Sequence, residues 1–339
     1  MTRVRVAVAV VALFAFARPA AAGDGRPAGP RDPIAWWVAR ARAALAGATA
    51  ARVPARTPPV PVAVEWLDKP RRLAALDLGA PLLALVGSDL DRDGTAELYA
   101  ITTREVVALA VAGGKIVERA RTPLPVEAPA IRPRDPVATA CFEHPGTPEL
   151  RVRASTGSRG ARYAWSGKHL VELGATPDFP VCTGKTLALV PGRNHFGTKD
   201  RPVYDVRCRN DLVDPSGAPL AINAELGAAG ALTVSTGATS VVLEAIGTAF
   251  AIADLDRDGA IEIVASGAGA PGDKDAIKVL AATPDAAAKK KPTPLHRTAF
   301  SGGVVAIVVT DIDGDGAEEV IGATRLGGTA KVDLWQLNK

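Results

Sequence analysis

The stretch DLDRDGTAEL, residues 89–98, places three aspartates at alternate positions, follows them with a glycine and then carries a glutamate. Two further copies occur, DLDRDGAIEI at 254–263 and DIDGDGAEEV at 311–320. Each copy lies between two short apolar runs of the kind that forms β-strands. The three copies therefore indicate an internal repeat, whose unit contains a strand, an acidic loop and a second strand.

The spacing of the copies predicts five repeat units. The stretch CFEHPGTPEL at 141–150 aligns with 89–98 without a gap and keeps the glycine and glutamate, but it lacks the aspartates. Loop glycines are 52 residues apart in the first two units and 57 in the last two, whereas 113 residues separate Gly146 from Gly259. The longer gap has room for one weaker unit, with its loop near residue 202.

A unit of 50 to 60 residues with four short strands has the size of a β-propeller blade. We therefore predict an all-β fold over residues 60–339, a β-propeller of about five four-stranded blades, with six as the alternative count. The last unit runs out of chain after its third strand, so its fourth strand is predicted at Val60–Trp66, which would close the ring. Strands of the first unit are predicted near 82–88, 97–102, 105–111 and 115–120.

The segment before the repeats reads as a leader and a linker. Residues 1–22 have the charged, apolar and small-residue order of a signal peptide. Residues 23–59 form a linker with one amphipathic helix at about 33–50. No later run is long and apolar enough to span a membrane, and no cysteine is placed for lipid attachment. We expect a secreted or periplasmic protein, without a membrane span and monomeric.

Net charge and cysteine content limit which partners and which disulfides we expect. Removing residues 1–22 takes away three arginines and no acid, so the formal charge falls from +4 to +1. A nucleic-acid partner is therefore not expected. Of the three cysteines, Cys182 and Cys208 flank a predicted hairpin and are predicted to form a disulfide, with three reduced core thiols as the alternative.

The acidic loops follow the pattern D-x-D-x-D-G-x-x-E, in which alternate carboxylates converge if the glycine at position 6 allows a sharp turn. An EF-hand would need an acid at position 12 and flanking helices, whereas here the last acid is at position 9. Four carboxylates, the position-7 carbonyl and water give six or seven hard oxygen ligands, which suits Ca²⁺. We predict about three calcium ions, and no ion in the second unit. The alternative is a set of solvated aspartate-rich turns.

These loops and their spacing resemble the FG-GAP/VCBS repeat family, which builds the propeller head of integrin α chains and occurs in many secreted bacterial proteins. The resemblance covers about residues 60–339, but the FG and GAP signatures are missing. It implies a Ca²⁺-binding loop between the first two strands of a blade and partners on the other side of the ring. The predicted ligands are Asp89, Asp91, Asp93, Thr95 and Glu97; Asp254, Asp256, Asp258, Ala260 and Glu262; and Asp311, Asp313, Asp315, Ala317 and Glu319.

No catalytic motif is recognisable in the sequence, so we do not predict an enzyme. The favoured interpretation is a secreted calcium-binding propeller that serves as a binding, adhesion or scaffold module for a protein or glycan partner. The alternative is a calcium-dependent extracellular carbohydrate-active enzyme, a lyase or hydrolase. An aromatic content of 4% argues against the alternative, because few side chains are available to stack on sugars.

Overall fold

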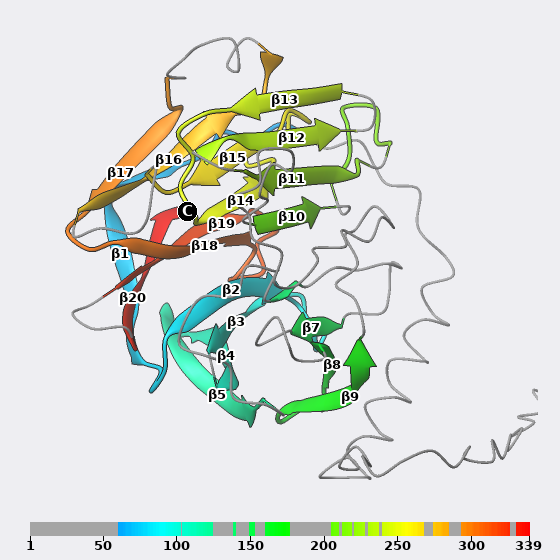
Figure 1. The fold of residues 1–339 in the computed structure, drawn as a ribbon, viewed down its shortest axis with the longest axis vertical. Helices are drawn as coiled ribbons and strands as arrows, with labels where there is room; N and C mark the ends of the chain where they lie inside the picture. Colours follow the sequence, from blue (N-terminus) through cyan, green and yellow to red (C-terminus); the bar gives the residue numbers. More distant parts are fainter. Residues whose placement is uncertain are drawn as a thin grey trace, which may run out of the picture.

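Five four-stranded antiparallel sheets form a five-bladed β-propeller, as the repeat spacing predicts (Figure 1). The structure is a computed structural model. It describes residues 60–102, 104–124, 138–139, 149–152, 160–176, 205–209, 212–218, 220–227, 230–236, 239–267, 274–284, 293–325 and 330–339.

Each blade is a meander of four strands, and the fifth blade takes its outermost strand from the start of the described chain. Blade 1 contains β2 (Leu82–Ser88), β3 (Glu97–Thr102), β4 (Glu105–Ala112) and β5 (Lys115–Pro123). Blade 2 contains β6 (Ala138–Thr139), β7 (Leu150–Val152), β8 (Gly160–Trp165) and β9 (Leu170–Thr176). Blade 3 contains β10 (Asp205–Arg209), β11 (Ile222–Leu226), β12 (Leu232–Thr236) and β13 (Thr239–Leu243). Blade 4 contains β14 (Phe250–Ala253), β15 (Glu262–Ala265), β16 (Asp275–Ala281) and β17 (His296–Phe300). Blade 5 contains β18 (Val304–Thr310), β19 (Glu319–Arg325), β20 (Lys331–Asn338) and β1 (Trp66–Asp77).

Burial changes from the inner to the outer strands of a blade. Strands β3 and β15 are buried at every residue, because neighbouring blades cover both of their faces. In the outer strands β5 and β17 the side chains are exposed or partly buried, except for the buried Ile116 of β5. This explains why the inner strands read as short continuous apolar runs in the sequence, whereas the outer strands carry many charges.

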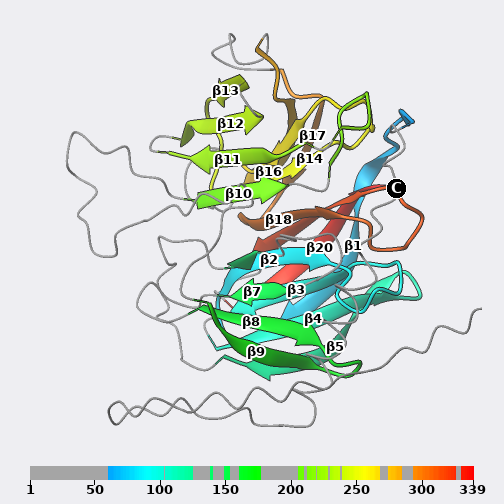
Figure 2. The ribbon, with the colours of Figure 1, turned by 90° about the vertical axis from the view of Figure 1, so that its right-hand side faces the viewer.

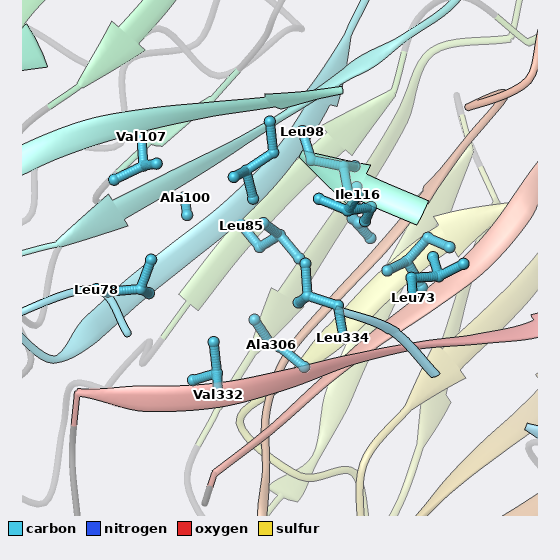
Figure 3. Packing of buried hydrophobic residues seen from close by; sticks show 14 of the residues in the cluster. Leu73, Leu78, Leu85, Leu98, Ala100, Val107, Ile116, Ala306, Val332 and Leu334 are labelled. Atoms are coloured by element: carbon cyan, nitrogen blue, oxygen red, sulfur yellow. The ribbon is translucent and has the colours of Figure 1, made fainter. Parts of the chain in front are cut away.

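The hydrophobic core is divided among the blade interfaces. One cluster packs Leu85 and Leu98 of blade 1 against Ala306 and Leu334 of blade 5 (Figure 3). Other clusters join blade 1 to blade 2, blade 3 to blade 4, and blade 4 to blade 5. The first strands of neighbouring blades are also in contact, in the order β6, β2, β18, β14 and β10. Among the described residues, apolar contacts therefore hold four pairs of neighbouring blades together.

The two ends of the described chain meet in blade 5, where β1 pairs antiparallel with β20 (Figures 1 and 2). The prediction that an N-terminal strand closes the ring is confirmed, but its placement at Val60–Trp66 is wrong. Residues 60–65 form no strand, and β1 begins at Trp66 and continues to Asp77. Pro61 has no N–H to donate to a ladder, and the amide of Val62 instead donates to Asp256 O at 2.7 Å.

Blade 3 corresponds to the predicted weaker repeat unit, but its first loop lies at a different position from the predicted one. Its first strand is β10, so the loop between its first and second strands lies around 212–218 and not near residue 202. The prediction was wrong because it divided the gap between Gly146 and Gly259 into equal periods, whereas these units differ in length. Strand β10 pairs with β11, and Cys208 stands opposite Asn223.

Several predictions concern residues outside the described ranges. The signal peptide at 1–22, the helix at about 33–50, Cys182 and the degenerate loop at 141–148 all belong to this group. The Cys182–Cys208 disulfide therefore stays a prediction. Within the described part of the chain, no helix has both the length and the apolar character needed to cross a membrane.

Candidate metal centres

The three acidic loops each join the first strand of a blade to the second, and each brings carboxylates together. Three ligand oxygens, one from each side chain of a set, lie within 4.8 Å of one another in every loop. Such groups can hold a metal ion. The three sets are Asp89, Asp91 and Glu97; Asp254, Asp256 and Glu262; and Asp311, Asp313 and Asp315. We call them sites 1, 2 and 3, and number loop positions from the first aspartate.

The curl of each loop depends on two residues with left-handed backbone. Position 6 is glycine in all three loops, with φ from 82° to 96°. Position 4 is also left-handed, with φ of 62° at Arg92, 56° at Arg257 and 80° at Gly314. Only position 6 was recognised from the sequence. The signal for position 4 was the glycine of the third copy, because a non-glycine residue in this region is strained.

The position-1 aspartates lie at the centre of each curl and accept backbone N–H groups. In site 3, Gly314 and Gly316 donate to the two oxygens of Asp311 at 2.7 and 2.8 Å. In site 1, Gly94 donates to Asp89 at 3.0 Å. These bonds hold the first carboxylate toward the cluster.

The position-5 aspartates accept the backbone N–H two residues further on, so they close the turn. These bonds join Thr95 to Asp93 (2.9 Å), Ala260 to Asp258 (2.6 Å) and Ala317 to Asp315 (2.7 Å). Asp93, Asp258 and Glu319 are not members of the clusters, so the structure does not bring these three predicted ligands together with the others. The position-7 carbonyl groups of Thr95, Ala260 and Ala317 stay predicted ligands.

The position-9 glutamates are buried, with exposed fractions of 2% for Glu97, 5% for Glu262 and 0% for Glu319. Burial, and then repulsion by the aspartates of the same loop, raises the pKa to about 7 for Glu97, about 8 for Glu262 and about 7 for Glu319. Burial is also the main cause that raises the pKa of Asp89 and Asp254. A cation between these groups would favour their charged forms.

Glu319 provides the clearest sign that a loop is suited to hold a cation. Its Oε2 atom accepts the N–H of Ile312 at 2.8 Å, whereas Oε1 is buried and has no hydrogen-bond partner. A buried carboxylate oxygen without a partner is costly, and the charges of Asp311, Asp313 and Asp315 lie close enough to raise its pKa. In site 1, Asp91 Oδ1 is likewise buried without a partner. The residues present therefore fit a hard cation.

Site 1 contains a protein cation that the sequence did not reveal. Arg119, on the outer strand β5, donates to Asp91 Oδ2 at 2.9 Å and also to Glu97. Tyr99 donates to the other oxygen of Glu97 at 3.0 Å. Arg119 follows Glu97 by 22 residues, so no local spacing marks the contact. Tyr99 was the sequence feature closest to the site, because it lies two residues after Glu97 and its hydroxyl group can donate to a carboxylate.

The three sites occupy consecutive blades, 4, 5 and 1, on the side of the ring where the first strands turn into the second. Ala96 of the first loop donates to Asp311 O of the third at 2.8 Å. Gly314 lies against Thr95, so that a Cβ on this glycine would be 2.9 Å from Thr95 Cγ2. Sites 1 and 3 are therefore in direct backbone contact, on both sides of the interface where the closing blade meets blade 1.

The corresponding loop of blade 3 is stabilised in another way. Asp214 Oδ1 accepts the backbone N–H groups of Ser216 at 2.8 Å and Ala218 at 2.9 Å. Hydrogen bonds with Ser216 and the backbone lower the pKa of Asp214. Within the described part of this loop, no group of three acidic side chains converges. Backbone donors therefore satisfy the aspartate in blade 3.

The fold and these clusters define the chain as a five-bladed β-propeller with three clusters of carboxylates, each of which can hold a metal ion. Its fold is similar to the crystal structure of BBS1N in complex with ARL6DN, soaked with lead, at a TM-score of 0.37 and 12% identity, over 81% of this chain and 98% of that chain. The crystal structure of S. cerevisiae core factor gives a TM-score of 0.22 and 9% identity, over 71% of this chain and 36% of that chain. No family model matches the chain, and no curated protein matches it. The propeller assignment rests on the strand pairing of this chain.

Proposed function

We propose that this chain is a calcium-braced β-propeller that serves as a binding or scaffold module. The ions would fix the loops that connect the first two strands of blades 4, 5 and 1. Carboxylate oxygens dominate the ligand set, which favours Ca²⁺ over metals that prefer nitrogen or sulfur. The loops supply carboxylates that bind and orient the ion, and nothing in the proposal requires chemistry at these sites.

The observation that carries the proposal is the buried, unpartnered Oε1 atom of Glu319 beside three aspartates. A solvated aspartate-rich turn would leave its carboxylates exposed to water or pair them with backbone donors, as Asp214 does in blade 3. Glu319 is fully buried and keeps one oxygen free. The same loop geometry at Asp254–Glu262 supports a shared role rather than a local accident.

The position of the sites supports a bracing role. Blade 5 is the only blade assembled from both ends of the described chain, through the pairing of β1 with β20. The loops with clusters belong to this blade and to its two neighbours. Ions there would stiffen the closure of the ring, where the covalent chain provides no direct connection between the first and last strands of the propeller.

The binding role is drawn from the resemblance to FG-GAP/VCBS repeats, to which we propose that this chain belongs. The partner would be a protein or a glycan that contacts the side of the ring opposite to the ions. The signal-like sequence at 1–22 supports a secreted or periplasmic location, where millimolar-affinity calcium sites are common in extracellular modules. Affinity capture from the native envelope or secreted fraction, with calcium and with chelator, tests for a calcium-dependent partner.

Thermal unfolding tests the bracing role directly. At a free Ca²⁺ concentration of 100 times the dissociation constant, each occupied site adds about 2.7 kcal/mol to the free energy of unfolding. We expect a chelator to lower the melting temperature, Ca²⁺ to restore it, and Mg²⁺ to restore it poorly, because Mg²⁺ gives up its water reluctantly. Identical melting curves with Ca²⁺ and with chelator would contradict the proposal.

The alternative of a calcium-dependent carbohydrate-active enzyme stays a prediction. A panel of glycans and esters, assayed with calcium present, tests it. Turnover that disappears when the purified propeller is unfolded would favour the alternative.

A further inference from the structure

The first acidic loop differs from the other two in the contacts of its glutamate. In sites 2 and 3 the glutamate accepts the N–H of loop position 2, from Leu255 to Glu262 at 2.9 Å and from Ile312 to Glu319 at 2.8 Å. In site 1 the position-2 N–H donates instead to the carbonyl oxygen of Ser88 at 3.1 Å. The glutamate of site 1 therefore does not cap its own loop.

Glu97 is engaged by two side chains that sites 2 and 3 lack. One oxygen accepts from Arg119 and the other accepts from Tyr99. The residues at the place of Tyr99 in the other two loops are Val264 and Ile321, which cannot donate a hydrogen bond. Protein donors therefore bind both oxygens of the site 1 glutamate.

Arg119 is itself held in place by the neighbouring blade. Its guanidinium carbon lies 4.6 Å from the ring centroid of Trp165, on β8 of blade 2. Its other contacts are the charge-assisted bonds to Asp91 and Glu97. The guanidinium thus lies between the first cluster and an aromatic face that favours a cation.

We propose that Arg119 acts as a built-in cation of site 1, and that a calcium ion must displace it before the site can bind. The inference rests on the proposed function, because it concerns the relative affinities of the same three sites. Asp91 keeps one free oxygen, so the site is weakened rather than lost. Two charge-assisted hydrogen bonds must break, but water screens them because the Arg119 side chain is 28% exposed, so site 1 should be roughly 10- to 100-fold weaker than sites 2 and 3.

Calcium titration by isothermal calorimetry of the full chain tests this ranking. The unsubstituted protein should bind two equivalents tightly and a third more weakly. In Arg119→Gln the guanidinium charge is absent, so the weakest dissociation constant should fall roughly 10- to 100-fold toward the other two. Arg121→Gln is the matched control, since Arg121 lies on the same strand and binds Glu118 and Glu105.

The outcomes separate this inference from the proposed function. A weakest constant that is unchanged or raised in Arg119→Gln would overturn the inference alone, because Arg119 would then be neutral or would help to orient the ligands. No binding in either protein would overturn the proposed function and the inference together. Three constants that converge in Arg119→Gln, but not in Arg121→Gln, would support both.

Trp165 supplies a second measurement that does not depend on the folding of the arginine variant. When Arg119 leaves the cluster, its contact with the Trp165 ring should change. The Trp165 part of the fluorescence, isolated by comparison with Trp165→Phe, should therefore respond to the third equivalent of calcium. A Trp165 signal that follows the first two equivalents would contradict the inference.

Discussion

Substituting Glu319 by glutamine should stabilise the calcium-free protein. Glu319 is fully buried, its Oε1 atom has no hydrogen-bond partner, and the aspartates of its loop lie close enough to raise its pKa. A glutamine could still accept the N–H of Ile312, while its neutral amide group would place N–H donors where the unpartnered carboxylate oxygen lies. The substitution therefore removes a buried charge and adds donors, with little change in volume.

The size of the effect follows from the pKa of Glu319. A rise from 4.5 to about 7 corresponds to about 3 kcal/mol when the group is ionised in both states, as at pH 8. With a chelator at pH 8, Glu319→Gln should thus be about 3 kcal/mol more stable than the unsubstituted protein. At pH 4 the gain should disappear, because the carboxyl is then largely protonated in both states.

Calcium should remove this advantage. At 100 times the dissociation constant, the unsubstituted protein gains about 2.7 kcal/mol from site 3. A variant with hundredfold weaker binding gains about 0.4 kcal/mol, so the difference falls below about 1 kcal/mol. Urea unfolding at pH 8, with chelator and with Ca²⁺, measures both values.

The matched control is Glu225→Gln on β11, the second strand of a blade whose described loop has no cluster. Its effect should be the same with chelator and with calcium. Destabilisation by Glu319→Gln in chelator, or an effect that did not depend on calcium, would contradict this prediction.

Two further predictions concern pH and the loop glycines. The pKa of Glu262 is raised from 4.5 to about 8. As pH rises, this carboxyl group loses its proton in the unfolded chain before it does so in the folded protein. The chelated protein should therefore lose a few kcal/mol of stability between about pH 4.5 and pH 8, and calcium should suppress the loss. Urea midpoints that rise with pH in chelator would disprove this. Alanine at Gly94 or Gly259 forces a positive φ on a non-glycine residue at a cost of about 1–2 kcal/mol. A Cβ at Gly259 would also lie 2.4 Å from Pro215 Cδ, whereas at Gly94 the space is open. Gly259→Ala should therefore lower the free energy of unfolding in urea by at least about 1 kcal/mol more than Gly94→Ala. Equal losses would contradict the crowding at Gly259.

The sequence predicted the fold well where strands are short, apolar and separated by clear turns. In blade 1 the predicted strands at 82–88 and 97–102 match β2 and β3, and the turn at Gly113 and Gly114 joins β4 to β5 with both glycines at positive φ. These signals are local, because each strand pairs with its neighbour along the chain. The sequence of a single blade therefore contains most of the strand and turn signals that predict its fold.

The prediction failed where structure depends on distant partners. Strand β1 is an edge strand, so only one of its edges is paired and its outer part contacts water. It therefore carries charged, exposed residues, and its sequence lacks the apolar pattern that predicts a strand. The length of blade 3 could not be obtained from an average period. Contacts such as that of Arg119 with Glu97 arise when an outer strand folds back over a loop, and sequence spacing does not record them.

Hydrogen exchange measured by mass spectrometry, with Ca²⁺ and with chelator, tests whether calcium braces the three acidic loops. Calcium should slow amide exchange at 89–97, 254–262 and 311–319, while β13 (Thr239–Leu243), the outer strand of blade 3, should be unchanged. Equal exchange of the three acidic loops in both conditions, or slowing of β13 to the same degree, would contradict a bracing role.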